Sequence, residues 1–196
     1  MKRLIAIVFA CFTLSAGAQN RAETLLRQAT EAVKSLGGYK VSFEVETSDY
    51  RADGRYAVSG REYYLAVDGM EVFCDGKIRY EVNNELREIT LDPVSAEGRN
   101  ILDNPVDALD FVGEQYRSEL LGESGGEALM RLVSTDGGPT IEVAVDTASH
   151  MPRKLIYRLP DNTAVEVRLK DIRQSKEPLP RFERSKYDGY SVLDMM

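Results

Sequence analysis

Residues 70–91 read MEVFCDGKIRYEVNNELREITL, three short runs of alternating apolar and polar residues separated by two turn signals. Asp75-Gly76 is a favoured pair for a tight hairpin turn, because glycine adopts positive φ without strain, and Asn83-Asn84 supplies a second turn. In the middle run Ile78, Tyr80 and Val82 share one face of the expected strand, while the residues between them are charged. The stretch therefore predicts a small antiparallel meander with one apolar face that must be covered.

Further alternating runs lie on both sides of the meander. They occur at KVSFEVET, RYAVS and REYYLAV before it, and at ALMRLV, TIEVAVD, KLIYRLP and TAVEVRLKDI after it. Strands that follow one another without intervening helices are typical of an antiparallel sheet rather than a parallel one. We therefore expect a mainly β, α+β fold with about nine to eleven strands in one strongly curved antiparallel sheet covered by helices.

Two helices are expected beside the sheet. Residues 22–36 place Leu25, Leu26, Ala29, Val33 and Leu36 on one helical face, and Gly37-Gly38 follow as a stop signal. A second helix is expected from Asn104, which can serve as its N-cap ahead of Pro105. Its apolar side would consist of Val106, Leu109, Val112, Tyr116 and Leu120.

The first 18 residues have the pattern of a secretory signal peptide. Lys2 and Arg3 precede an apolar run from Leu4 to Leu14, and Ala16-Gly17-Ala18 is a small-residue cleavage site. Cleavage after Ala18 would leave residues 19–196 as a single domain in the periplasm. The alternative is a lipoprotein acylated at Cys11, but Val8-Phe9-Ala10 is a poor acylation sequence.

Charge and composition exclude several classes of function. The chain carries 25 basic and 32 acidic residues, a net charge of −7, and loss of Lys2 and Arg3 makes the mature chain about −9. A surface this acidic is unsuited to nucleic acid and to anionic lipid headgroups. After cleavage Cys74 is the one remaining cysteine, so an internal disulfide cannot form.

Motifs for catalysis or metal binding are not found in the sequence. His150, the single histidine, is followed closely by Pro152 and suits a surface turn. One histidine and one mature cysteine cannot make a zinc site, and no serine lies in a nucleophile motif, so we expect no enzyme and no cofactor. A carboxylate pair for glycoside hydrolysis stays open, because the fold and not the spacing would assemble it. Cys74 lies beside Asp75, which favours an inert thiol over a reactive one.

Tyrosine is frequent in the expected strands, at positions 56, 63, 64, 80 and 157. Its apolar ring with a polar tip suits the rim of a hydrophobic cleft. The same residues could equally pack a dry core under the helices, and periodicity alone leaves both interpretations open.

The order of these motifs resembles the periplasmic outer-membrane lipoprotein carrier family, the LolA-like proteins. The resemblance covers nearly the whole mature chain, and its most specific part is the apolar strand that leads into Asp75-Gly76-Lys77, with Tyr80 after it. The terminal FERSKYDGYSVLD adds Phe182, Gly189, Val192 and Asp194 at the positions of the family's end pattern.

What the resemblance implies is an open, unclosed antiparallel β-barrel whose apolar concave face, lidded by helices, binds lipid. The function implied is a non-catalytic, monomeric carrier that takes acylated lipoproteins or a related lipid from an inner-membrane donor complex to an outer-membrane receptor. A binding or scaffold module of the same fold, with a packed interior and an acidic surface for a protein partner, is the alternative. The apolar side chains expected to line the groove are Val41, Phe43, Val45, Tyr56, Tyr63, Leu65, Val72, Ile78, Tyr80, Val143, Val145, Leu155 and Tyr157.

Overall fold

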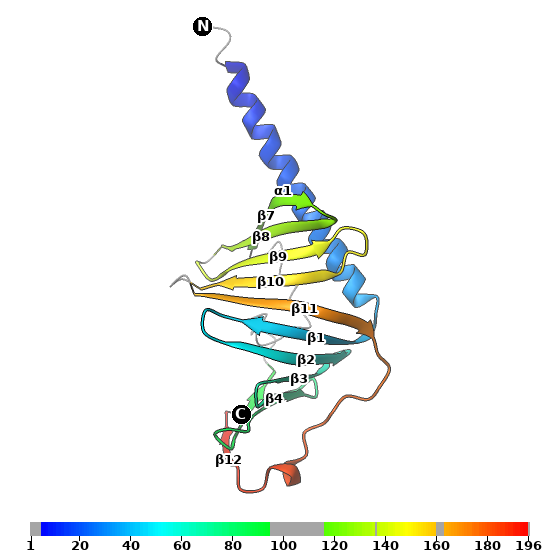
Figure 1. Cartoon of the computed structure of the whole chain (residues 1–196), viewed down its shortest axis with the longest axis vertical. Coiled ribbons are helices and arrows are strands. Elements are labelled where there is room, and N and C mark those ends of the chain that lie inside the picture. The colour runs from blue at the N-terminus through cyan, green and yellow to red at the C-terminus, as the bar shows by residue number, and fades with distance from the viewer. Residues whose placement is uncertain (1–4, 95–115, 136, 160–162, 196) are drawn as a thin grey trace. The chain divides into compact units, whose positions relative to one another are not determined.

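The computed structural model describes residues 5–94, 116–135, 137–159 and 163–195, with the side chains described from residue 20 onward (Figure 1). It divides into two compact units. Unit 1 contains residues 1–32 and 109–164, and unit 2 contains residues 33–108 and 165–196. The expectation that residues 19–196 form a single domain stays a prediction.

Unit 1 combines most of a long helix with four antiparallel strands. The helix is α1 (Ile5–Lys34), and the strands lie in the order β10 (Pro152–Arg158), β9 (Thr140–Asp146), β8 (Glu127–Ser134) and β7 (Tyr116–Ser124). Figure 1 shows α1 in blue and these strands in green to yellow. Leu25 and Leu26 of α1 are each only 1% exposed, which confirms the apolar face expected for this helix. Arg21 of α1 also forms an ion pair with Glu123 of β7, with 2.9 Å between their side-chain atoms.

Unit 2 contains eight strands in the order β12-β6-β5-β4-β3-β2-β1-β11. Their bounds are β1 (Gly38–Glu46), β2 (Arg51–Ser59), β3 (Glu62–Val67), β4 (Met70–Cys74), β5 (Ile78–Asn83), β6 (Glu88–Pro93), β11 (Ala164–Gln174) and β12 (Ser191–Asp194). Neighbouring strands are antiparallel except β12, which pairs with β6 in parallel. The first and last strands of this order do not pair with each other, so the unit is an open sheet. The mainly β, open antiparallel fold class is confirmed.

Both turns of the opening meander form close to where its sequence predicts them, but the second is longer than expected, because Asn83 ends β5 and pairs with Glu88, which leaves residues 84–87 as the turn. Gly76 has a φ of +84°, and the Asp75 carboxylate accepts hydrogen bonds from the backbone N–H groups of Lys77 and Ile78, both at 2.8 Å. At the second turn the Asn83 side-chain oxygen accepts from the N–H groups of Glu85 and Leu86. Short side chains that satisfy backbone donors fix these hairpins and therefore the register of β4, β5 and β6.

The expectation of a second helix is wrong for its last part. Tyr116 and Leu120 belong to strand β7, where they pair with Ser134 and Met130 of β8. A spacing of four residues is compatible with a helical face and also with one face of a strand, and the pairing with β8 decides for the strand. The rest of the expected helix, residues 104–115, lies outside the described residues.

Candidate functional site

The candidate site is the apolar face of the unit 2 sheet across β11, β1, β2, β3 and β4. Its buried members are Tyr39, Val41, Phe43, Tyr56, Val58, Tyr63, Val72 and Cys74. Half-buried apolar side chains continue the same cluster, namely Val33, Leu36, Val45, Leu65, Val67, Val94, Val167, Leu169 and Ile172. We call this set the apolar face.

Strand alternation produces the apolar face from a simple pattern. Val41, Phe43 and Val45 of β1 lie on one side of the strand, and they pair with Ile172, Leu169 and Val167 of β11. The register of the two strands shifts by one residue between Ser42 and Phe43, where β11 has one extra residue. This bulge keeps the apolar side chains of both strands on the same side of the sheet. The residues between them on β1 point to the opposite side of the sheet.

Burial is graded along the apolar face. At one end Val58 and Tyr63 are 3% and 4% exposed, and the half-buried Val33 of α1 and Leu36 of the following turn pack against the same cluster. At the other end Val45 and its neighbours on β3 and β11 are only half-buried. Among the described residues, the half-buried end therefore leaves apolar surface accessible.

Tyrosine rings form a row within the buried end. Tyr56 lies between Tyr39 and Tyr63, with ring centroids 6.3 Å and 5.9 Å apart, in edge and tilted arrangements. Cys74 closes the row as a free, buried cysteine, and burial raises the pKa of its thiol. Burial and a raised pKa both favour the protonated thiol, so an inert Cys74 stays the prediction.

Eleven of the thirteen groove residues predicted from the sequence fall into two groups, one in each unit. Val41, Phe43, Val45, Tyr56, Tyr63, Leu65 and Val72 come together on the apolar face. Val143, Val145, Leu155 and Tyr157 share a face of β9 and β10 in unit 1, where Leu155 pairs with Val143. Val143 and Val145 are fully buried there.

The remaining two predicted residues, Ile78 and Tyr80, need a correction. Tyr80 pairs with Phe73 and belongs to a second cluster on the other side of the sheet, and strand alternation places Ile78 on that side too. The apolar side of the middle strand of the meander is therefore not part of the apolar face. The first strand, which contains Val72, contributes to it instead.

The C-terminal segment covers Tyr80. Phe182 stacks on Tyr80 with ring centroids 4.4 Å apart and on Tyr187 with centroids 5.6 Å apart. Tyr187 belongs to the short helix η1 (Arg184–Tyr187), and its hydroxyl donates to the Glu71 carboxylate at 3.0 Å. Burial and this carboxylate together raise the pKa of Tyr187. We call this set, with Tyr64, Phe73, Val82, Ile89 and Tyr190, the aromatic cluster.

Sequence reasoning missed part of the apolar face. Tyr39 and Val58 extend the alternation of β1 and β2 by two residues, so the same periodicity could have found them. Placing Val167, Leu169 and Ile172 on the apolar face requires knowing that β11 pairs with β1. The two strands are far apart in the sequence: Arg168, which contacts Glu44, follows it by 124 residues.

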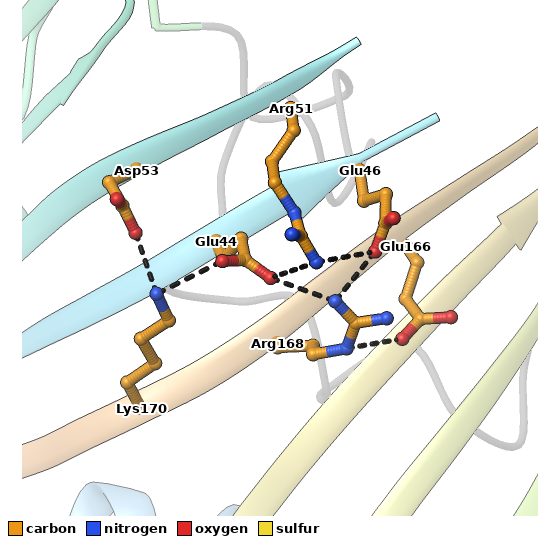
Figure 2. Close-up of polar contacts among 7 residues, drawn as sticks. All are labelled: Glu44, Glu46, Arg51, Asp53, Glu166, Arg168 and Lys170. Atoms are coloured by element: carbon orange, nitrogen blue, oxygen red, sulfur yellow. Dashed lines mark hydrogen bonds and ion pairs between the residues drawn. The ribbon is translucent and has the colours of Figure 1, made fainter. Parts of the chain in front are cut away.

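The opposite side of β2, β1 and β11 is a network of ion pairs, shown in Figure 2. Arg168 contacts Glu44 at 2.8 Å, Glu46 at 2.6 Å and Glu166 at 2.8 Å. Lys170 bridges Glu44 at 3.1 Å and Asp53 at 2.7 Å. Arg51 also contacts Glu44 at 3.2 Å. The hydrogen bonds from Lys170 and Arg168 lower the pKa of Glu44.

This network leaves little free charge on that side of the sheet. Four carboxylates, from Glu44, Glu46, Asp53 and Glu166, face three cations in it. An acidic docking surface would need carboxylates that are available to a partner, whereas these already have intramolecular partners.

Among the described residues, no group of three His, Cys, Asp or Glu side chains is placed to hold a metal ion. Within the same residues, the structure contains no helix with the length and apolar composition of a membrane span.

Comparison with known proteins places the fold. No protein-family model matches the chain, and no curated protein matches it. The chain is similar to the structure of an uncharacterized conserved protein from Thermus thermophilus, with a TM-score of 0.57 and 10% identity over 89% of this chain and 99% of that one. It is also similar to MucB, with a TM-score of 0.53 and 14% identity over 89% of this chain and 66% of MucB.

A LolA superfamily protein is also among the structures to which the chain is similar. It comes from Nitrosomonas europaea, and the similarity has a TM-score of 0.40 and 11% identity over 85% of this chain and 96% of that one. That TM-score is too low to support an inference about ligand or partner. At 10% and 14% identity, the two stronger similarities show a shared fold and nothing about chemistry.

Proposed function

We propose that the protein is a non-catalytic periplasmic carrier that binds lipid acyl chains on the apolar face of unit 2. The observation that supports this most directly is the grading of that face, from buried tyrosines to half-buried valines across five strands. An acyl chain laid along the half-buried end would remove these side chains from water without needing a polar partner.

The energy of acyl transfer makes such a carrier necessary. Each buried CH₂ is worth about 0.8 kcal/mol, so a sixteen-carbon chain resists exposure to water by about 12 kcal/mol. A lipid-modified protein therefore needs a shielding partner to cross an aqueous compartment. A shallow, adaptable face also suits release at a receiving membrane better than a tight pocket does. The proposed cargo is an acylated lipoprotein or a related lipid, passed from an inner-membrane donor to an outer-membrane receptor.

Two substitutions test the acyl-binding role with a fluorescent fatty acid as the probe. Val45→Glu introduces a carboxylate at the half-buried end, where it can stay hydrated, and we expect the protein to fold and to lose probe binding. Phe43→Glu introduces the same charge at a side chain that is 7% exposed. If the face opens to admit a ligand, this variant also folds and fails to bind.

Ser42→Glu is the matched control, because Ser42 is exposed on the opposite side of the same strand. It should bind the probe as the parent does. Two results would contradict the carrier: no probe binding by the native protein, or unchanged binding by Val45→Glu. A parent that does not bind, together with a Phe43→Glu variant that does not fold, would indicate the packed scaffold instead.

A further inference from the structure

A hollow of about 420 Å³ opens on the sheet of unit 1. Strands β8, β9 and β10 supply most of its lining, with the turn between β8 and β9. The lining residues are Arg131, Gly137, Gly138, Thr140, Glu142, Arg158 and Leu159. Its charged members come from three neighbouring strands, so the sheet itself fixes their spacing.

Glu142 is a buried charged residue in the lining of this hollow. It is 7% exposed, although it belongs to a residue type that is rarely buried. One of its carboxylate oxygens contacts Arg131 at 3.2 Å, and the other contacts Arg158 at 3.4 Å. Burial alone would raise the pKa of Glu142, but the hydrogen bonds from Arg158 and Arg131 outweigh it and hold the pKa below its usual value. The carboxylate is therefore ionised at neutral pH and holds one arginine on each oxygen.

Both arginines keep donors that face solvent. Their contacts with Glu142 each use a single terminal nitrogen, and the side chains of Arg131 and Arg158 are 39% and 47% exposed. A guanidinium has five N–H donors, so most of them stay available in each side chain. The described lining carries two positive charges and one negative charge, so this hollow is locally cationic, although the chain's net charge of −7 disfavours anionic headgroups over the surface as a whole.

The rest of the lining suits a ligand with an anionic group. Thr140 brings a hydroxyl that can donate, and a Cβ built on Gly137 would meet no atom within 4 Å, so the hollow has room beside the turn. Leu159 is 39% exposed at the same hollow and offers apolar contact. Two pre-positioned guanidinium forks are the arrangement that proteins use for planar or tetrahedral oxyanions.

We propose that this hollow binds a phosphate group, with Arg131 and Arg158, one on each side of the Glu142 carboxylate, as the ligands. The phosphate can belong to a free phosphate compound or to a lipid headgroup. The chemistry at the arginines is the same in both cases. This inference does not depend on the acyl-binding role of unit 2.

The test is calorimetric titration of the full mature chain with inorganic phosphate and, separately, with a short-chain phosphatidylglycerol kept below its micelle concentration. We expect binding of at least one of the two probes. Preference for the lipid identifies a headgroup site only where Arg131→Gln and Arg158→Gln abolish that preference, because the acyl chains can also bind the apolar face of unit 2. Equal binding of the two probes, or preference for inorganic phosphate, identifies a site for free phosphate. Arg158→Gln and Arg131→Gln should each weaken binding about tenfold, since each removes one charged fork. Arg153→Gln, which breaks a pair with Asp146 outside the hollow, should have no effect.

The variant Glu142→Gln tests whether Arg131 and Arg158 bind phosphate or serve only as ion-pair partners of Glu142. Its amide removes the one negative charge of the described lining, so we expect phosphate to bind several-fold more tightly than in the parent. Circular dichroism confirms that each variant is folded before it is titrated. The proposal is overturned if neither probe binds the parent, or if both arginine variants bind as the parent does.

Discussion

Gly54 and Phe43 form a contact that depends on the absence of a side chain. The two residues are partners across β1 and β2, and the Phe43 ring lies where a Cβ on Gly54 would be. Glycine within a strand normally weakens it, and here it provides the space for an aromatic ring. The position of Phe43 on the apolar face is thus set by a residue on the neighbouring strand.

We expect Gly54→Ala to destabilise the protein by about 1–3 kcal/mol, because the new methyl group forces the Phe43 ring out of its place. Urea denaturation measures this change in the free energy of unfolding. Replacing Phe43 by alanine in the same chain should make the two effects strongly non-additive, since the clash is then gone. Gly122→Ala is the control, because a Cβ there meets no atom within 4 Å. Equal effects of Gly54→Ala with and without Phe43 would contradict this account.

At the scale of elements, β1 has two sides with different roles. Phe43 and its neighbours build the apolar face, while Glu44 and Glu46 hold β1 to β11 through Arg168. A hydrogen bond that Arg168 donates lowers the pKa of Glu46, and hydrogen bonds donated by Lys170 and Arg168 lower the pKa of Glu44. These ion pairs therefore stabilise the fold fully at pH values above 4.5, the ordinary pKa of glutamate. The stabilisation is lost as the pH falls through the lowered pKa values of Glu44 and Glu46 in the folded protein.

Arg168→Gln should lower the Tm at pH 7, because three carboxylates lose a partner. The difference in Tm between parent and variant should shrink as the pH is lowered from about 5 towards about 2, when the glutamates become protonated in both. Thermal unfolding at several pH values measures this. Arg27→Gln, which removes an isolated exposed pair with Glu31 on α1, should change the Tm little at any pH. A Tm difference that is independent of pH would show that Arg168 acts through packing alone.

The C-terminal segment is a second element with a defined contact, through Phe182 between Tyr80 and Tyr187. Phe182→Ala should cost about 2 kcal/mol of unfolding free energy, less than for a fully buried phenylalanine because Phe182 is only half-buried. It should also speed proteolytic cleavage within residues 175–190, since the segment loses its central ring. Leu86→Ala, at a side chain that is 71% exposed, is the control and should have neither effect. Unchanged cleavage in Phe182→Ala would show that other contacts hold the segment.

At the scale of the whole molecule, the first question is where the mature chain begins. We expect Gln19 to be the first residue of the mature protein, because Ala16-Gly17-Ala18 fits signal peptidase. Intact mass spectrometry of the protein isolated from cells that express the full chain measures this. A diacylglyceryl adduct on Cys11 would establish membrane anchoring instead. A mass that includes residues 1–18 would show that this segment is retained.

Sequence periodicity was sufficient wherever a single strand or helix decides its own structure. The alternation in KVSFEVET predicts which side of β1 is apolar, and the Asp75-Gly76 turn predicts the hairpin of β4 and β5, because both depend on backbone geometry within a few residues. The buried side of α1 at Leu25 and Leu26 follows in the same way from a period of about 3.6 residues. These features are local, and their physical cause is present in the sequence itself.

Only the tertiary structure decides which apolar sides come together. Tyr80 and Val72 belong to adjacent strands of one meander, and periodicity gives each strand an apolar side without saying whether the two sides are the same. Because Tyr80 pairs with Phe73, it lies on the side of the sheet opposite to Val72. The C-terminal segment, about 100 residues later in the chain, covers Tyr80. The assembly of Arg131, Glu142 and Arg158 likewise exists only because β8, β9 and β10 are aligned in one register. Strand register depends on contacts between distant residues, and such contacts leave no periodic trace in the chain.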